Sequence, residues 1–401
     1  MSTAELTAAL RRRAFELGFT LVGVCPAVAP AGVNRLAEWL ARGYAGDMHY
    51  FAQRQAAYAH PGHVLDGVRS IIMLGLPYDS GPSQPLEPGQ GRVARYAWGP
   101  LDYHDAIRQR LHKLADRLRE LAPAAATRGV VDTAPLLERE FAQLAGLGWV
   151  GKNTLLLNRH AGSYFFLGAL LTDALLEIDA PHDADHCGTC TACLESCPTQ
   201  AFPQPYVLDA SRCISYLTIE HRGEISPELR PGMGDWLFGC DICQQVCPWN
   251  HHAAKGAART GEPPMVATIA PAVPADAPPL KPLEHDASDA GRRAATPPAL
   301  ELIPLFALSE AEFRARFRHT PLWRPHRRGL LRNAAIVLGN QRSAAAIPAL
   351  TRGLCDPEPL VREACAWSLE QITGEPTPSR PPDSGQGSPS LAALHPAPAG
   401  A

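Results

Sequence analysis

Hydrophobic and polar positions along the first 180 residues predict helices and strands in alternation. Ser2 and Glu5 have the spacing of a capping box, and the apolar residues after them recur at the helical period. Short apolar runs over residues 19–24 and 70–76 predict strands, the second of them buried. We therefore expect an α/β domain over residues 1–180.

The same domain continues through several further elements. An amphipathic pattern over residues 102–121 predicts a long helix, and a short strand follows near residues 129–132. Residues 135–145 predict a second helix, which ends before Gly146 because glycine commonly closes helices. The apolar run 163–171 predicts another strand.

Beyond residue 250 the pattern breaks and then becomes helical. Residues 251–298 are dominated by alanine, proline and glycine, which predicts a flexible insertion rather than a packed element. Helical periodicity returns over residues 299–374, where helix pairs are similar to a HEAT-type repeat. The tail 375–401 is rich in proline, serine and glycine, and we expect it to be disordered.

Eight of the eleven cysteines fall into two compact groups. The first group reads C-x2-C-x2-C-x3-C-P, and the second reads C-x2-C-x3-C-P with one more cysteine upstream. This is the spacing of two-cluster bacterial ferredoxins, in which the cysteine before each proline ligates the other cluster. The pattern assigns one [4Fe–4S] cluster to Cys187, Cys190, Cys193 and Cys247, and the other to Cys197, Cys213, Cys240 and Cys243.

A structural zinc site and a disulfide framework are the alternatives for these cysteines. Zinc sites usually use two separated cysteine pairs, and disulfides do not suit a chain without secretory features. We therefore expect a ferredoxin-like domain with two clusters over residues 181–250, and an α+β fold class for the whole chain. The cysteines outside the pattern are interpreted as packing residues: Cys25, Cys355 and Cys365.

Composition indicates how large a core the chain can bury and in which cellular compartment we expect it. With 401 residues and 46% hydrophobic content, the chain can bury a full core, and we expect two or three domains. No stretch reaches the roughly 18 unbroken apolar residues of a membrane span, and we find neither a signal peptide nor a twin-arginine leader. We therefore expect a cytoplasmic, monomeric protein with no membrane partner.

The net charge of −3 argues neither for nor against nucleic acid, but the charges are unevenly distributed. Between Glu312 and Asp356 the chain has nine arginines and neither an acidic residue nor a lysine. Such a run favours bidentate contacts to phosphate. The alternative is a helical surface that is paired with acidic residues elsewhere.

Several polar, glycine-rich segments resemble those of the epoxyqueuosine reductase family. They are V-D-T-A-P at 131–135, G-K-N-T at 151–154 and C-I-S-Y-L-T-I-E at 213–220, together with both cysteine motifs. The resemblance covers roughly residues 5–250 closely and the repeat region more loosely. It implies reduction of the epoxide of epoxyqueuosine at the tRNA wobble position to queuosine, the last step of queuosine synthesis. It also implies base-off cobalamin beside the clusters and an external low-potential electron donor.

The resemblance further implies roles for individual residues. Asp132 matches the family's proton donor, for which we expect a pKa raised by burial; taken alone, an aspartate here could equally be a helix N-cap. Gln53 stands where the family has an arginine, and the neighbouring Arg54 could replace it. The expected cobalamin contacts are Asp132, Asn153, Ser163, Ser215, Cys240 and Asp241. The expected contacts to the anticodon stem-loop of tRNA are Arg222, Arg324, Arg327, Arg328 and Arg332.

Two other functions fit part of the pattern. A reductive dehalogenase is similar in pairing cobalamin with two ferredoxin clusters, but it normally carries the twin-arginine signal that we do not find. A non-catalytic electron-transfer protein on a helical-repeat scaffold would hold clusters and no corrin. Turnover that depends on Asp132 separates this electron carrier from an enzyme.

Overall fold

The computed structural model describes residues 1–78, 85–99, 102–251 and 298–377. Its N-terminal part is built on a four-stranded antiparallel sheet with the strand order β1-β2-β7-β4. The strands are β1 (Leu21–Pro26), β2 (Ser70–Pro77), β7 (Phe165–Thr172) and β4 (Thr127–Val130). Every residue of β2 is buried, which agrees with the continuous apolar run in the sequence.

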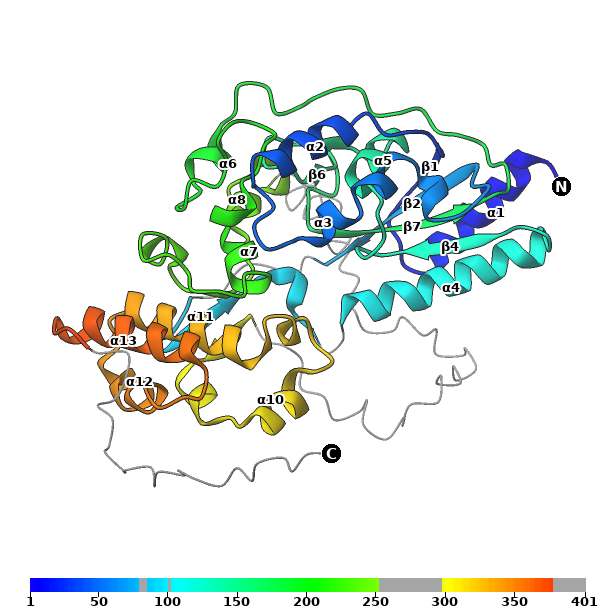
Figure 1. Cartoon of the computed structure of the whole chain (residues 1–401). Helices are drawn as coiled ribbons and strands as arrows, with labels where there is room; N and C mark the ends of the chain where they lie inside the picture. The colour runs from blue at the N-terminus through cyan, green and yellow to red at the C-terminus, as the bar shows by residue number, and fades with distance from the viewer. Residues whose placement is uncertain (79–84, 100–101, 252–297, 378–401) are drawn as a thin grey trace, which may run out of the picture.

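Helices cover both faces of this sheet (Figure 1). Helices α1 (Thr3–Glu16) and α4 (Tyr103–Leu121) share one hydrophobic core, and α5 (Glu138–Leu144) packs on the other face. The predicted capping box at the start of α1 is confirmed. Asp102 caps α4, because its carboxylate accepts a hydrogen bond of 2.9 Å from the backbone N–H of His104.

Shorter elements complete the N-terminal part. They are α2 (Val33–Ala41), α3 (Tyr50–Gln53), and a hairpin of β5 (Trp149–Val150) and β6 (Leu156–Leu157). The cysteine-rich segment contains α6 (Ala192–Glu195), α7 (Ile214–Ile219) and α8 (Ile242–Gln245). Helices α6 and α8 contact each other, which brings the two cysteine motifs together.

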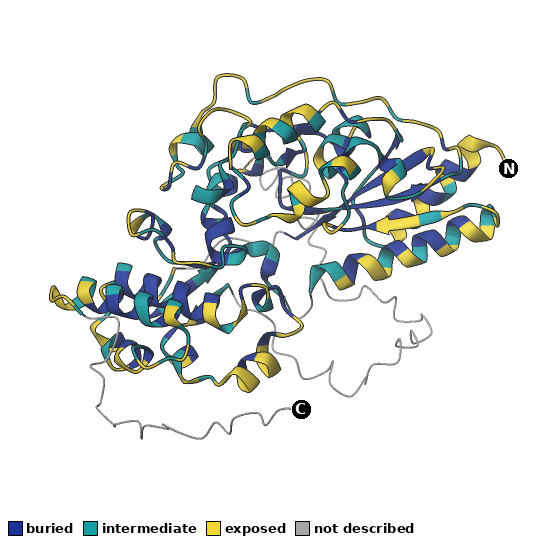
Figure 2. Ribbon diagram, in the orientation of Figure 1, coloured by how far each residue is buried: buried dark blue, intermediate teal, exposed yellow. Residues whose placement is uncertain are grey.

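The C-terminal part is helical, as the periodicity predicted. It contains α10 (Glu310–Phe317), α11 (His326–Asn340), α12 (Ile347–Gly353) and α13 (Pro359–Thr373). Helix α11 is buried at every position from Gly329 to Gly339 and packs along α13 (Figure 2). A helix that is apolar all round belongs inside a core rather than on a surface.

A second, three-stranded sheet joins segments that are far apart in the sequence. Its order is β8-β3-β9, with β3 (Gln90–Val93) parallel to β8 (Trp236–Phe238) and antiparallel to β9 (Ala299–Glu301). The largest hydrophobic core includes residues of all three strands and of α7, α11 and α13. The cysteine-rich segment and the helical repeat therefore share one core.

Several element boundaries differ from the sequence prediction by a few residues, and two of them affect the position of Asp132. Strand β4 ends at Val130, and α5 begins at Glu138 instead of residue 135, so Asp132 lies in the loop between them. Residues 252–297 of the predicted insertion and residues 378–401 of the predicted tail lie outside the described residues. In the described part of the chain, no helix combines the length and the apolar character that crossing a membrane requires.

Candidate active site

Asp132 lies in the loop after β4 in an unusual backbone conformation. Its φ angle is 60°, in the left-handed region that residues other than glycine rarely adopt. Its carboxylate accepts a hydrogen bond of 2.7 Å from the hydroxyl of Tyr103 and lies 3.4 Å from Nε2 of His104. Its backbone N–H donates to Glu138 over 2.9 Å. The side chain nevertheless remains 60% exposed, so a ligand can reach it.

The ionisation of Asp132 differs from the sequence-based expectation. Burial alone would raise its pKa, but hydrogen bonds from His104 and Tyr103 outweigh burial, and the pKa is lowered. The expectation of a raised pKa is therefore wrong. The alternative role as an N-cap is also wrong, because the residue before α5 is Leu137.

Two neighbours of Asp132 hold protons at neutral pH instead. Burial would lower the pKa of His104, but its contacts with Asp102 and Asp132 raise it to about 9. Burial, and then the charge of Asp132, raise the pKa of Glu138 to about 8. Sequence analysis missed both residues, although Asp102 and His104 are two positions apart and Glu138 follows the recognised V-D-T-A-P segment.

Two tyrosines, Tyr96 and Tyr50, interact with Asp132. Burial raises the pKa of Tyr96, and the charges of Asp241 and Asp132 raise it further, so Tyr96 interacts with both carboxylates. Burial and then Glu220 raise the pKa of Tyr50, which also interacts with Asp132 and with Arg324 of the helical repeat. The site is therefore built from the N-terminal part, the cysteine-rich segment and the repeat.

Arg54 also reaches this loop. Its guanidinium donates a hydrogen bond of 3.1 Å to the carbonyl oxygen of Thr133, next to Asp132. Gln53 is the last residue of α3. Arg54 therefore brings a positive charge to the region where the resemblance led us to expect an arginine.

The first set of cysteines lines one cavity, as the spacing predicted. This cavity of about 220 Å³ is lined by Cys187, Cys190, Cys193 and Cys247, together with Lys152, Asn153 and Trp249. Lys152 donates hydrogen bonds to the carbonyl oxygens of Gly188 and Cys190, over 2.6 and 2.9 Å. These contacts fix the loop that carries the cysteines.

The second set of cysteines also converges. Burial raises the pKa of Cys243, and the neighbouring thiols of Cys213, Cys193 and Cys197 raise it further. Burial also raises the pKa of Cys240, which interacts with Cys243 and Cys213. In the described residues, no three His, Cys, Asp or Glu side chains converge tightly enough for a single metal ion.

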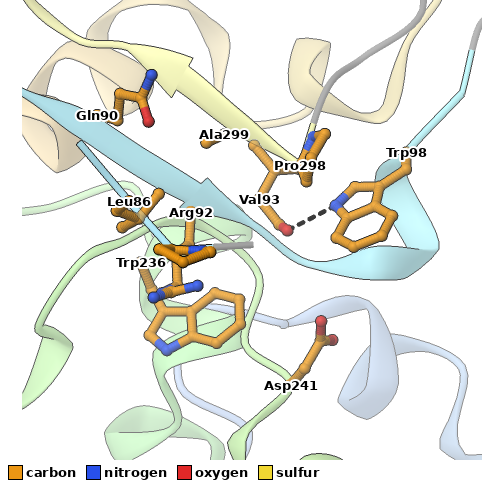
Figure 3. A pocket seen from close by; sticks show the side chains of 10 residues that line it. Leu86, Gln90, Arg92, Val93, Trp98, Trp236, Asp241, Pro298 and Ala299 are labelled. Carbon is orange, nitrogen blue, oxygen red and sulfur yellow. Dashed lines mark hydrogen bonds between the residues drawn. The ribbon is translucent and has the colours of Figure 1, made fainter. Parts of the chain in front are cut away.

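Asp241 lines a second cavity of about 220 Å³ beside Cys240 (Figure 3). Arg92, Trp98 and Trp236 also line this cavity, and Trp236 packs against Cys240. The buried carboxylate of Asp241 accepts a hydrogen bond of 2.9 Å from the backbone N–H of Arg95. The indole N–H of Trp98 donates over 2.8 Å to the carbonyl oxygen of Val93. The cavity thus offers aromatic faces and a buried charge.

The remaining expected cobalamin contacts lie in different surroundings. Asn153 is buried at the first cysteine cavity, where its amide donates to the carbonyl oxygen of Cys243 over 3.4 Å. The hydroxyl of Ser163 is buried and accepts hydrogen bonds of 3.0 Å from both Gln244 and Asn250. Ser215 is partly exposed on α7. The structure therefore uses Asn153 and Ser163 in internal contacts.

Two of the arginines expected to bind tRNA have structural roles. Arg332 is 1% exposed and donates to the carbonyl oxygens of Leu217 and Gly223 over 2.5 and 2.7 Å, so its assignment to a phosphate-binding surface is wrong. The side chain of Arg327 is 12% exposed and pairs with Asp356 at 2.7 Å. A run of arginines in a sequence does not reveal which of them are buried.

The other three arginines lie closer to the solvent. The side chain of Arg324 is 53% exposed and pairs with Glu220 at 2.9 Å, while Arg222 donates to the carbonyl oxygen of Arg324 over 2.8 Å. Arg328 is 43% exposed, with its guanidinium 4.0 Å from Glu358. We call Arg222, Arg324 and Arg328 the rim arginines, because Arg324 interacts with Tyr50, which in turn interacts with Asp132.

Three parts of the chain match known families. Residues 186–250 match a 4Fe-4S double cluster binding domain, and residues 328–381 match HEAT repeats. Residues 59–133 match the family described as epoxyqueuosine reductase QueG, DUF1730. The matched region ends one residue after Asp132.

Individual proteins are similar over most of the chain. The epoxyqueuosine reductase of Pseudomonas aeruginosa is 41% identical over 377 residues, covering 92% of this chain and 95% of the relative. That of Escherichia coli is 38% identical over 371 residues, covering 92% and 89%.

Solved structures are similar over the same extent. A crystal structure of epoxyqueuosine reductase with an epoxyqueuosine-modified tRNA-Tyr stem loop is 30% identical, with a TM-score of 0.75, and the match covers 92% of this chain and 90% of the other. The structure from Bacillus subtilis, with its catalytic aspartate loop swung out of the active site, is 29% identical with the same TM-score and coverage.

Proposed function

This chain belongs to the epoxyqueuosine reductase family, and we propose that it uses cobalamin to convert epoxyqueuosine at the tRNA wobble position into queuosine. It is an oxidoreductase. Conversion of the epoxide to a cyclopentene takes up two electrons and two protons and releases one molecule of water. The site must therefore bring a proton donor and an electron source to the same carbon–oxygen bonds.

The observation that carries this proposal is that Asp132 lies beside the proton-holding His104 and interacts with Tyr96, which also interacts with Asp241 of the cysteine-rich segment. The carboxylate of Asp132 lies 3.4 Å from Nε2 of His104. Tyr96 interacts electrostatically with both Asp132 and Asp241, and Asp241 directly follows the cluster ligand Cys240. An epoxide bound at Asp132 would thus have proton donors and the second cysteine set in its surroundings.

Residues around the cavity in Figure 3 fit part of a corrin cofactor. The buried carboxylate of Asp241 can accept hydrogen bonds from amide side chains, and the indoles of Trp98 and Trp236 offer flat apolar surfaces. When bound, base-off cobalamin supplies a strongly nucleophilic, low-potential cobalt centre. Asp132 would then deliver a proton to the departing oxygen, and Tyr96 would interact with both this acid and Asp241.

The two cysteine sets would hold [4Fe–4S] clusters, which supply single electrons when bound. Cys190 is exposed, whereas the other seven cysteines of the two sets are partly exposed or buried. We infer that an external low-potential donor docks beside Cys190.

The rim arginines would contact the phosphates of the anticodon stem-loop. A relative has been crystallised with a modified tRNA stem loop, which supports RNA as the partner. Tyr50 is 36% exposed at the same rim and offers an aromatic face for a base. The wobble nucleoside would enter between α3 and the helical repeat and reach Asp132.

The proposal is tested by anaerobic conversion of the natural substrate. The cluster-loaded protein is incubated with cobalamin, a low-potential reductant and epoxyqueuosine-containing tRNA, and the nucleosides of the digested tRNA are weighed by mass spectrometry. We expect the loss of one oxygen mass, with no loss when cobalamin is omitted. Conversion without cobalamin, or no conversion by protein with intact clusters and bound corrin, would contradict the proposal.

A further inference from the structure

A second carboxylate lies behind the Asp132–His104 pair. Oδ1 of Asp102 is 2.7 Å from Nδ1 of His104, and Nε2 of the same ring is 3.4 Å from Oδ2 of Asp132. Both ring nitrogens of His104 thus face carboxylates. The side chain of Asp132 is 60% exposed, that of His104 23% and that of Asp102 28%, so only the first opens widely to a ligand.

We propose that Asp102 and His104 form a proton relay that protonates Asp132 during the reaction. In this relay His104 transfers the proton on Nε2 to the carboxylate of Asp132, and Asp102 holds the ring in position and stabilises its protonated form. The inference rests on the proposed role of Asp132 as the acid that protonates the departing oxygen. Asp102 and His104 act through Asp132 and are positioning residues.

The stoichiometry of the reaction requires that two protons be delivered to the departing oxygen. Both carbon–oxygen bonds of the epoxide break, one carbon–carbon π bond forms, two electrons enter from the reductant, and two protons leave with the oxygen as water. The lowered pKa leaves Asp132 ionised before the reaction, and a carboxyl group carries only one proton at a time, so both protons must reach it from a neighbouring group. His104 is within reach for this step, and it regains its proton from solvent.

The groups that face His104 come from several elements. Asp102 precedes α4, Asp132 follows β4, and Glu138 comes from α5, where Arg139 interacts with both Asp132 and Glu138. On α4 itself, Tyr103 stacks on the ring, with the centroids 4.0 Å apart, and Arg108 interacts with Asp102.

Opposing effects act on the charge of His104. Its position in the first turn of α4 disfavours a cation, because the helix dipole is positive at that end. Burial acts in the same direction, yet the two carboxylates raise its pKa to about 9. The ring therefore carries its transferable proton at neutral pH and loses it as the pH rises through about 9.

The relay is tested by single-turnover conversion measured as a function of pH in the holoenzyme. His104→Gln keeps an N–H donor toward Asp132 but cannot transfer a proton. We expect its rate to fall about 10²-fold or more, with an unchanged KM for tRNA and without the loss of rate near pH 9 that the wild type shows. His112→Gln is the matched control, because His112 is an exposed histidine on the same helix.

Asp102→Asn is the second variant of this test. It leaves the His104 ring in place but removes the negative charge next to Nδ1 of the ring. We expect its alkaline loss of rate to move to lower pH, with intact clusters by absorption. A His104→Gln rate within about threefold of the wild type, or an unmoved alkaline limb in Asp102→Asn, would overturn the relay. If the wild type itself fails to convert the substrate, the proposed function fails instead.

Discussion

Asp132 combines a strained backbone with a carboxylate that two donors hold. Its left-handed φ of 60° and its hydrogen bond from Tyr103 are features that a sequence motif cannot reveal. The resemblance identified the residue, but it led us to place the transferable proton on it, whereas the structure places protons on His104 and Glu138. The error arose because Tyr103 and His104, at the start of α4, decide the ionisation of Asp132, and the motif does not include them.

Asp132→Asn tests whether Asp132 acts as an acid, because the variant removes the carboxyl group and preserves the shape of the side chain. Asparagine has nearly the same shape and still accepts a hydrogen bond from Tyr103, but it cannot supply a proton. We expect conversion of epoxyqueuosine to fall by about 10²-fold or more while iron content and cluster absorption stay unchanged. Asp105→Asn is the control, because Asp105 is an exposed carboxylate whose only described ion pair is with Arg108. Turnover by Asp132→Asn within a few-fold of the wild type would remove Asp132 from the mechanism.

The raised pKa of Glu138 predicts a pH-dependent stability. Its folded pKa of about 8 lies above the ordinary value of 4.5, so between these values the unfolded chain ionises Glu138 while the folded chain keeps its proton. The free energy of unfolding of the wild type therefore falls as the pH rises toward 8. Glu138→Gln lacks this loss, and we expect its stability relative to the wild type to grow from pH 6 to about pH 8 and then level off.

Denaturant unfolding of the holoenzyme at several pH values measures this difference. Glu120→Gln serves as the control, because the side chain of Glu120 is 63% exposed on α4. A difference between Glu138→Gln and the wild type that does not change with pH would show that Glu138 is already ionised at neutral pH.

At the scale of elements, α11 shows why a run of arginines in the sequence does not identify a phosphate-binding surface. The spacing of apolar residues predicted this helix, and the structure confirms it. The arginines on it have unlike surroundings: Arg328 is 43% exposed, Arg327 pairs with Asp356, and Arg332 is enclosed. Which face of a helix is covered depends on segments more than one hundred residues away, and local periodicity holds no information about them.

Because these arginines differ in exposure, we expect substitutions of the exposed ones to affect tRNA binding and substitutions of the buried ones to affect stability. We expect Arg324→Gln and Arg328→Gln each to weaken tRNA binding and to reduce the slope of log affinity against log salt concentration by about 1. Arg352→Gln, at an exposed position on α12, is the matched control. Binding is measured by fluorescence anisotropy at several salt concentrations, and unchanged slopes for both rim variants would exclude the rim arginines as phosphate contacts.

Arg327→Gln should act on stability rather than on binding. The carboxylate of Asp356 is 7% exposed and accepts two hydrogen bonds from Arg327. Removal of one partner of a largely buried pair leaves the other charge uncompensated, which costs about 3–5 kcal/mol in typical cases. We expect a lower midpoint of thermal unfolding with tRNA affinity close to that of the wild type. The reverse pattern would return Arg327 to the RNA interface.

At the scale of the whole molecule, the two sheets differ in how far the sequence predicts them. The buried strands β2 and β7 have apolar runs long enough to be recognised, and the cysteine spacing encodes the cluster ligands directly. Strands β3, β8 and β9 have only three or four residues each, and their pairing joins segments more than two hundred positions apart. Such pairing follows from the tertiary fold and has no local signal.

The shared core predicts that the cluster segment and the repeat unfold together. Asn333 is fully buried on α11, and its amide donates to the carbonyl oxygens of Thr218 and Leu237 over 2.8 and 3.0 Å. Asn333→Leu leaves both carbonyls without this donor, at a cost of about 1–3 kcal/mol each. We expect cluster absorbance and helical circular dichroism to lose their signals at the same lowered denaturant concentration, whereas Glu370→Leu, at an exposed position on α13, leaves both near the wild type. If the clusters persist at wild-type concentrations while the helices unfold earlier, the repeat is an independent unit, and tRNA bound there could not influence the cluster segment through this core.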